Sequence, residues 1–156
     1  MSRLVVIGIG NSDRGDDAFG RVVAARLHGR LPEQVRLIEE DGEATSLLDQ
    51  LADVDAAILI DAALSGGEPG TIHRFDAARA PLSAARFGLS THGFGLAEAI
   101  ELGRILGQLP ARCIVYAVEA GSFELGAPLS PALARVVDEV AARVIAEAHQ
   151  SSPSDA

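Results

Sequence analysis

A group of acidic residues directly follows the first apolar segment of the chain. Residues 4–9 form a run of Leu, Val and Ile with one glycine, which is the pattern of a buried strand. The run leads through Gly10 to three acids, Asp13, Asp16 and Asp17. Gly-x-Gly after a strand is typical of a dinucleotide-binding loop, but Asp13 stands where that fingerprint needs a third glycine, and the acids would repel a pyrophosphate. The segment therefore predicts a site that works through carboxylates, and it disfavours NAD or FAD.

Two further residues that could do chemistry lie far along the chain. Asp61 ends the uncharged run of residues 56–60, and His92 stands just before a segment with helical spacing of apolar residues. Together with Asp17 they make two carboxylates and one imidazole, a set that can hold a divalent metal ion with one position open. The two carboxylates also fit an aspartic dyad, in which one acid stays protonated because of the other. The sequence leaves both chemistries open, and each residue alone also has a structural explanation, such as an acid at a helix N-terminus.

The pattern of apolar runs and turns predicts the elements that would bring these residues together. Core strands are expected over residues 3–9, 34–39, 56–61 and 112–118, an edge strand over 71–75, and helices from residue 17 and after residues 45, 95 and 130. Strands that alternate with helices predict an α/β fold, a three-layer doubly wound sandwich around a mostly parallel five-stranded sheet with one antiparallel edge strand. In such sheets ligands bind beyond the carboxyl ends of the strands, where the first loop, Asp61 and His92 would converge. We expect a single domain over residues 1–150, a frayed tail over 151–156, and Ser130 as the cap of the last helix.

Composition narrows the class of protein. The chain has 156 residues, 48% of them hydrophobic, and a formal net charge of -9, so it lacks the basic surface that nucleic acids and anionic membranes require. No apolar run approaches the roughly 20 residues of a membrane span or forms a signal-peptide core, so we expect a cytoplasmic protein. The single cysteine, Cys113, lies in an apolar segment and is expected to be a buried thiol rather than a nucleophile. The chain contains no lysine and no Gly-x-Ser-x-Gly or His-Glu-x-x-His motif, which disfavours other common hydrolase arrangements.

Several motifs carry a resemblance to a known family. In chain order they are Gly8-Ile9-Gly10-Asn11 with Asp16-Asp17-Ala18-Phe19-Gly20, then Ile60-Asp61-Ala62, then Ser90-Thr91-His92-Gly93-Phe94-Gly95-Leu96, and finally Gly126-Ala127-Pro128-Leu129-Ser130-Pro131. In order and spacing these motifs resemble those of the [NiFe]-hydrogenase maturation endopeptidases. The resemblance implies a small α/β protease that removes a short C-terminal extension from the hydrogenase large-subunit precursor once nickel has been inserted.

The resemblance also implies roles for individual residues. Asp17, Asp61 and His92 match the family's metal-binding residues, and the nickel is expected to be carried by the precursor rather than held by the resting enzyme. Asp16, Asp17 and Asp61 are the candidates for catalysis of the aspartyl protease type, with Asp16 taking part either in cleavage or in orienting the site. Asp17 stands where some relatives have Glu, so its side chain is one methylene shorter. Residues 41–45 are expected to have a supporting role near the substrate, and the protease is expected to act as a monomer.

Two other functions fit the same residues. A noncatalytic, chaperone-like α/β module in hydrogenase assembly would use the acidic edge to bind a metal or a partner. A different hydrolase of this fold would use the same side chains to hold a resident metal ion. Cleavage of the precursor separates the protease from the module, and a resident stoichiometric zinc is expected only for the other hydrolase.

Overall fold

Five strands form one mixed sheet in the computed structural model, which describes residues 3–80 and 94–150. The strand order is β2-β1-β3-β5-β4, and every neighbouring pair is parallel except β4 with β5. The strands are β1 (Leu4–Ile9), β2 (Arg36–Glu40), β3 (Ala56–Ala63), β4 (Ile72–Asp76) and β5 (Arg112–Glu119). The predicted mostly parallel sheet is confirmed, and β4 is its antiparallel edge strand.

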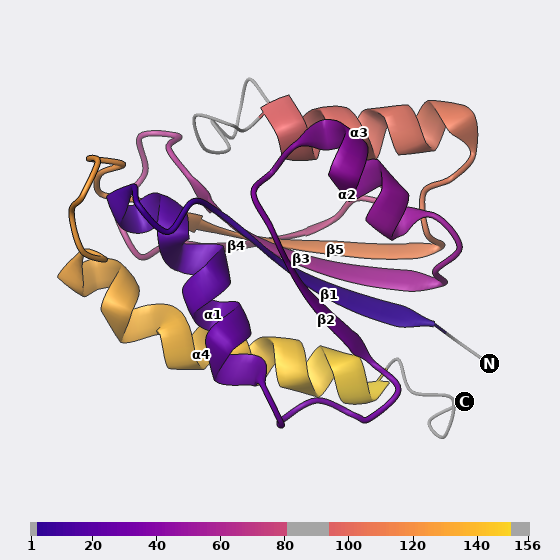
Figure 1. The fold of residues 1–156 in the computed structure, drawn as a ribbon, viewed down its shortest axis with the longest axis horizontal. Helices are drawn as coiled ribbons and strands as arrows, with labels where there is room; N and C mark the ends of the chain where they lie inside the picture. Colours follow the sequence, from indigo (N-terminus) through magenta and orange to yellow (C-terminus); the bar gives the residue numbers. More distant parts are fainter. Residues whose placement is uncertain (1–2, 81–93, 151–156) are drawn as a thin grey trace.

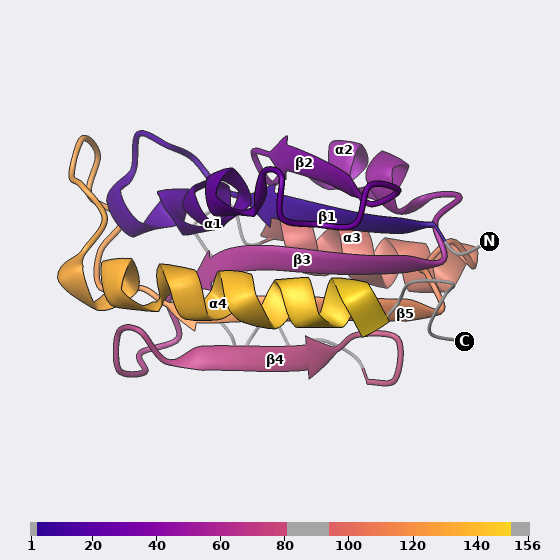
Figure 2. The same cartoon turned by 90° about the horizontal axis from the view of Figure 1, so that it is seen from below.

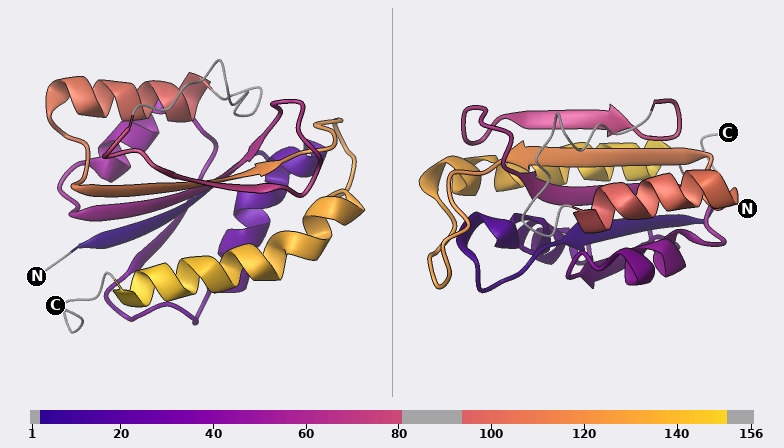
Figure 3. Two further views of the ribbon diagram at one scale, coloured as in Figure 1. Left: turned by 180° about the vertical axis from the view of Figure 1, so that it is seen from behind. Right: turned by 90° about the horizontal axis from the view of Figure 1, so that it is seen from above.

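Helices cover both faces of the sheet and complete three layers. On one face α1 (Phe19–Leu27) packs beside α4 (Pro131–Gln150), and on the other α2 (Ala44–Leu51) packs beside α3 (Phe94–Leu106) (Figure 1). Figure 2 shows α1 and α4 across the near face of the sheet, and the right-hand view of Figure 3 shows α2 and α3 across the opposite face. The predicted doubly wound sandwich is confirmed. Among the helices of the described ranges, none combines the length and hydropathy needed to cross a membrane.

Alternation of side chains along the central strands builds a core on each face. In β3, Ile60 belongs to the core under α1 and α4, whereas Leu59 and Ala63 belong to the core under α2 and α3. All residues of β1 and β3 are buried, as expected for strands covered on both faces. β3 continues two residues past its predicted end at Asp61, because the chain keeps pairing with β5 as far as Ala63. Asp61 therefore lies inside the strand, near its carboxyl end.

A buried carboxylate ties α4 to two strands. Glu147 accepts hydrogen bonds from three side chains: the Tyr116 hydroxyl, Arg74 Nη2 at 2.6 Å and Arg112 Nη2 at 2.9 Å. Burial raises the pKa of Glu147, but the hydrogen bonds from Arg74 and Tyr116 outweigh this effect and hold the pKa below the ordinary 4.5. Burial, together with the same hydrogen bond, raises the pKa of Tyr116 to about 12. The network therefore joins α4 to β5 at its first residue and at its middle, and to the middle of the edge strand β4.

We expect Glu147→Gln to change how stability depends on pH. A carboxylate whose pKa is lower in the folded chain stabilises the fold above its unfolded pKa, and this contribution is lost as the pH falls through the folded pKa. The wild-type free energy of unfolding should therefore fall more steeply than that of the variant between about pH 5 and about pH 3. Near neutral pH the variant should be less stable by about 1–3 kcal/mol, because a buried charged network is broken. Urea unfolding across this range measures both effects, and parallel pH profiles would contradict them.

Candidate active site

The loop after β1 places two adjacent acids at the carboxyl ends of the parallel strands. The chain turns through Gly10 into a short 3-10 helix, η1 (Gly15–Ala18), in which Asp16 and Asp17 are both 1% exposed. Figure 1 shows η1 at the same end of the sheet as the β3–β4 loop and the β5–α4 loop. η1 also contacts β3, so the structure brings the first loop and the third strand together as the sequence predicts.

Two glycines allow η1 and the start of α1 to pack directly on the strand backbones. A methyl group at Gly10 would overlap the carbonyl oxygen of Asp17, and one at Gly20 would overlap carbonyl oxygens of both β1 and β3. The Asp17 carbonyl accepts a hydrogen bond from the Asn11 N–H at 3.1 Å. Only glycine fits where two backbones approach this closely. The first Gly-rich motif therefore serves to place Asp17.

Asp61 lies close to Asp17 in the interior of the fold. By the alternation of β3 it shares a face with Leu59 and Ala63, and it is 1% exposed. Its Oδ1 accepts a hydrogen bond from the N–H of Ala62 at 2.8 Å. Burial raises the pKa of Asp61 well above the ordinary 3.8; the hydrogen bond from Ala62 opposes this effect, and the negative charge of Asp17 adds to it. The two predicted site carboxylates therefore interact electrostatically.

A pair of buried carboxylates that repel each other favours either a shared proton or a bound cation. Residues 3–80 and 94–150 contain no group of three His, Cys, Asp or Glu side chains that could hold a metal ion. His92, the third predicted ligand, lies outside the described residues, two positions before the start of α3. The described residues thus supply the two oxygen donors of the predicted set, Asp17 and Asp61.

Asp16 turns its carboxylate toward the β5–α4 loop. Oδ2 accepts hydrogen bonds from the N–H groups of Gly121 at 2.7 Å and Ser122 at 3.2 Å, and Oδ1 accepts one from the N–H of Ser130 at 2.7 Å. Ser130 directly precedes α4, as predicted for its cap, and its carbonyl accepts the N–H groups of Leu133 and Ala134, whereas its hydroxyl oxygen is buried and makes no hydrogen bond with the described residues. The Asp16 carboxylate lies at the same helix N-terminus. Of the two roles that the sequence leaves open for Asp16, these contacts favour orienting the site.

Glu119 is a buried carboxylate that the sequence motifs do not single out. It ends β5, is 1% exposed, and accepts hydrogen bonds from the hydroxyl and from the N–H of Ser65, the latter at 3.2 Å. Nε2 of His73 lies 3.1 Å from Oε1 of Glu119. Burial raises the pKa of Glu119, but the hydrogen bonds from Ser65 and His73 outweigh it and lower the pKa overall. The carboxylate lies between the serine and the histidine, which differs from the Ser–His contact of a hydrolase triad. The sequence does carry a signal for Glu119: like Asp61, it is an acid at the end of an apolar run.

Arg14 also lies outside the predicted set. Its carbonyl accepts a hydrogen bond from the Asp17 N–H at 3.0 Å, so it belongs to the same turn as the two acids. Its Nε is buried and has no hydrogen-bond partner within the described part of the chain. Arg14 therefore brings a guanidinium group to the same turn as the two acids.

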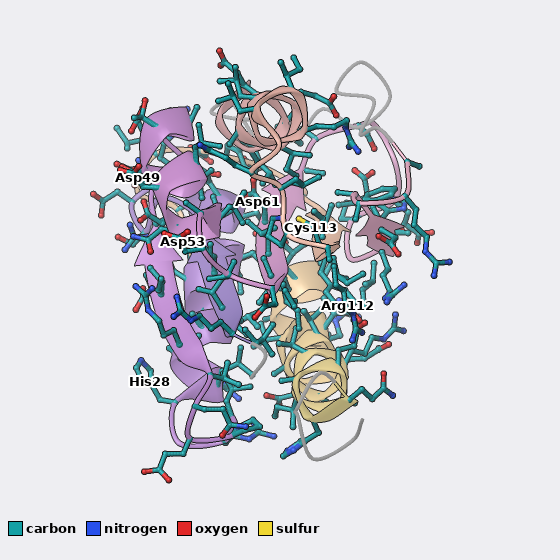
Figure 4. The ribbon with its side chains drawn as sticks, turned by 90° about the vertical axis from the view of Figure 1, so that its right-hand side faces the viewer. His28, Asp49, Asp53, Asp61, Arg112 and Cys113 are labelled. Carbon is teal, nitrogen blue, oxygen red and sulfur yellow. The ribbon has the colours of Figure 1, made fainter. Side chains whose placement is uncertain are left out.

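Cys113 is a buried thiol, as the sequence predicts. It is fully buried in β5, and burial raises the pKa of its thiol to about 12. A thiol with this pKa is not ionised near neutral pH and is a poor nucleophile. Figure 4 shows Cys113 and Asp61 in the interior of the fold, whereas Asp49, Asp53 and His28 lie on its outside.

The fold is a doubly wound α/β sandwich with a buried acidic pair at the carboxyl edge of its sheet. Comparison with known proteins identifies the family. The chain belongs to the hydrogenase maturation protease family, whose HycI model matches residues 22–147. The resemblance carried by the motifs is thereby confirmed, and the chain is an enzyme of the protease class.

Relatives of known function and structure agree with this assignment. The chain is similar to the hydrogenase expression/formation protein HupD of Rhodobacter capsulatus, with 30% identity over 149 residues that cover 93% of this chain and 70% of that protein. It is 27% identical over 152 residues to the hydrogenase 2 maturation protease of Escherichia coli (strain K12), covering 96% of this chain and 92% of that one. The solved structure of the hydrogenase maturating endopeptidase HybD from E. coli matches with a TM-score of 0.83 at 26% identity over 99% of both chains.

Gly10→Ala tests whether backbone packing places Asp17. The added methyl group would overlap the Asp17 carbonyl, so we expect the variant to lose about 1–3 kcal/mol of stability and to shift the NMR signals of Asp17 and Asp61. Gly103→Ala is the matched control, because its methyl group would meet Leu48 at an ordinary 3.5 Å in the interior of α3. The control should gain about 0.5–1 kcal/mol and leave both aspartates unchanged. Unperturbed aspartate signals in Gly10→Ala would refute this role of the glycine.

Proposed function

We propose that this protein is an endopeptidase that removes a C-terminal extension from a nickel-loaded [NiFe]-hydrogenase large-subunit precursor. Membership of the hydrogenase maturation protease family supports the reaction class. The single observation that carries the rest is the buried pair of Asp17 and Asp61, each 1% exposed; burial raises the pKa of Asp61, and the charge of Asp17 adds to this effect. Such a pair gains most from a divalent cation, and nickel in the precursor is a cation that only the correct substrate brings.

Asp17, Asp61 and His92 are the residues that would contact the nickel of the precursor. A mixed set of two carboxylates and one imidazole suits a borderline divalent ion such as nickel. This contact would also fix the position of the nearby peptide bond, which lowers the entropic cost of reaching the transition state. The attacking water would be polarised by a site carboxylate or by the metal ion.

The proposal is tested by incubating the purified protein with nickel-loaded and nickel-free precursor and following the mass of each by spectrometry. We expect loss of a C-terminal peptide from the loaded form only, because the nickel-free form lacks the cation that the carboxylate pair recognises. Casein is the control substrate and should remain intact. Cleavage of casein or of nickel-free precursor would contradict recognition through nickel, and no cleavage of any substrate would favour the noncatalytic module.

Variants of the predicted ligands test the same proposal residue by residue. Asp17→Asn, Asp61→Asn and His92→Gln should each slow processing of the loaded precursor by at least about 100-fold, because each removes one contact that positions the substrate. Asp49→Asn is the matched control, since Asp49 is an exposed acid on α2. It should process at the wild-type rate. Circular dichroism checks that each variant is folded, and a rate near wild type for any of the three folded ligand variants would remove that residue from the site.

A further inference from the structure

The Asp16 carboxylate is engaged entirely by the backbone of a distant loop. It is 1% exposed and accepts three N–H hydrogen bonds, from Gly121 at 2.7 Å, Ser122 at 3.2 Å and Ser130 at 2.7 Å. Hydrogen bonds to an ionised acceptor are about twice as strong as neutral ones, and both oxygens of Asp16 take part. A carboxylate with these contacts is poorly placed to take a proton from water or to attack a peptide.

The same two loops are joined by their backbones on either side of this carboxylate. The Asp16 N–H donates to the Ser122 carbonyl at 3.0 Å, and the Gly126 N–H donates to the Asp13 carbonyl at 2.7 Å. Between them Gly15 adopts a φ of +55°, and a methyl group there would lie 2.9 Å from the Ser122 carbonyl. The β5–α4 loop and residues 13–16 therefore form one connected unit at the carboxyl edge of the sheet.

Asp17 follows Asp16 within η1, so any shift of this unit moves Asp17 as well. The Asp17 N–H donates to the Arg14 carbonyl at 3.0 Å, which places Asp17 in the turn that Asp16 anchors. We propose that Asp16 is a positioning residue that holds Asp17 against Asp61 by fastening η1 to the β5–α4 loop. This inference rests on the proposed function for the role of Asp17, but the fastening itself is independent of that function.

Asp16→Asn tests whether Asp16 positions Asp17 or serves only the stability of the fold. The amide keeps the size of the side chain but replaces one acceptor oxygen with an N–H donor, which faces a backbone N–H and cannot bond to it. We expect processing of the loaded precursor to fall by about 100-fold, as for a misplacement of a site residue by about 1 Å. Amide hydrogen exchange at Gly121, Ser122 and Ser130 should accelerate, and the NMR signals of Asp17 and Asp61 should shift.

Glu147→Gln is the matched control for a loss of stability without displacement of the site. Glu147 lies near the end of α4 and is bonded to Arg74, Tyr116 and Arg112. None of these hydrogen bonds involves η1, so its change should leave processing and the aspartate signals at wild-type values. If Asp16→Asn does not fold, Asp16→Glu keeps the charge but lengthens the side chain, and it should show the same displaced signals and slowed processing.

Two results would overturn the proposal. One is a folded Asp16→Asn with unshifted Asp17 and Asp61 signals, because positioning requires that they move. The other is a loss of processing no larger than that of Glu147→Gln at equal loss of stability, because that would make Asp16 only structural. Exchange rates and chemical shifts are measured without substrate, so they decide whether Asp16 positions Asp17 even if the wild-type protein processes no precursor.

Discussion

The close approach of two backbones at the carboxyl ends of β1 and β3 is the constraint on which the rest of the structure depends. Because Gly10 and Gly20 carry no Cβ, η1 and the start of α1 lie directly on the strands rather than a side chain's width above them. The Asp17 carbonyl is then held by the Asn11 N–H. Backbone packing therefore sets where the Asp17 backbone lies relative to β3, and the Asp16 carboxylate fastens the same turn to the β5–α4 loop.

The buried carboxylates at this edge differ in their surroundings, and the difference separates their roles. Asp16 accepts three backbone N–H groups, and Glu119 is held by Ser65 and His73, which lower the pKa of Glu119. Burial raises the pKa of Asp61, and the like charge of Asp17 adds to this effect, whereas the single hydrogen bond from the N–H of Ala62 opposes it. A group whose surroundings disfavour its charged form is one that a proton or a cation can stabilise. Asp16 and Glu119, whose carboxylates are fully hydrogen-bonded, hold loops in place. The pair of Asp17 and Asp61 is the one suited to bind a proton or a cation.

The parts of this structure that could be predicted from the sequence are those with a local signal. Apolar runs predicted the strands, and the position of Asp61 at the end of such a run predicted that it belongs to a site. The partners of Asp16 lie 105 and more residues further along the chain, and no local pattern encodes contacts that depend on where two loops meet. The Ser-Pro pair at Ser130 marked the right helix start, but no local pattern predicts that the N–H of Ser130 donates to Asp16, a residue 114 positions earlier in the chain.

The charge balance of the chain links this arrangement to selectivity. The chain has no lysine and a net charge of -9; Arg74 and Arg112 are bonded to Glu147, and Arg14 lies in the same turn as Asp16 and Asp17. A buried carboxylate pair is stabilised further by positive charge that arrives with the substrate. On the proposed function, a precursor that carries nickel supplies this charge, whereas an ordinary peptide supplies none and gains no comparable binding energy. In that proposal, electrostatic repulsion within the carboxylate pair would favour substrates that carry the metal ion over those that lack it.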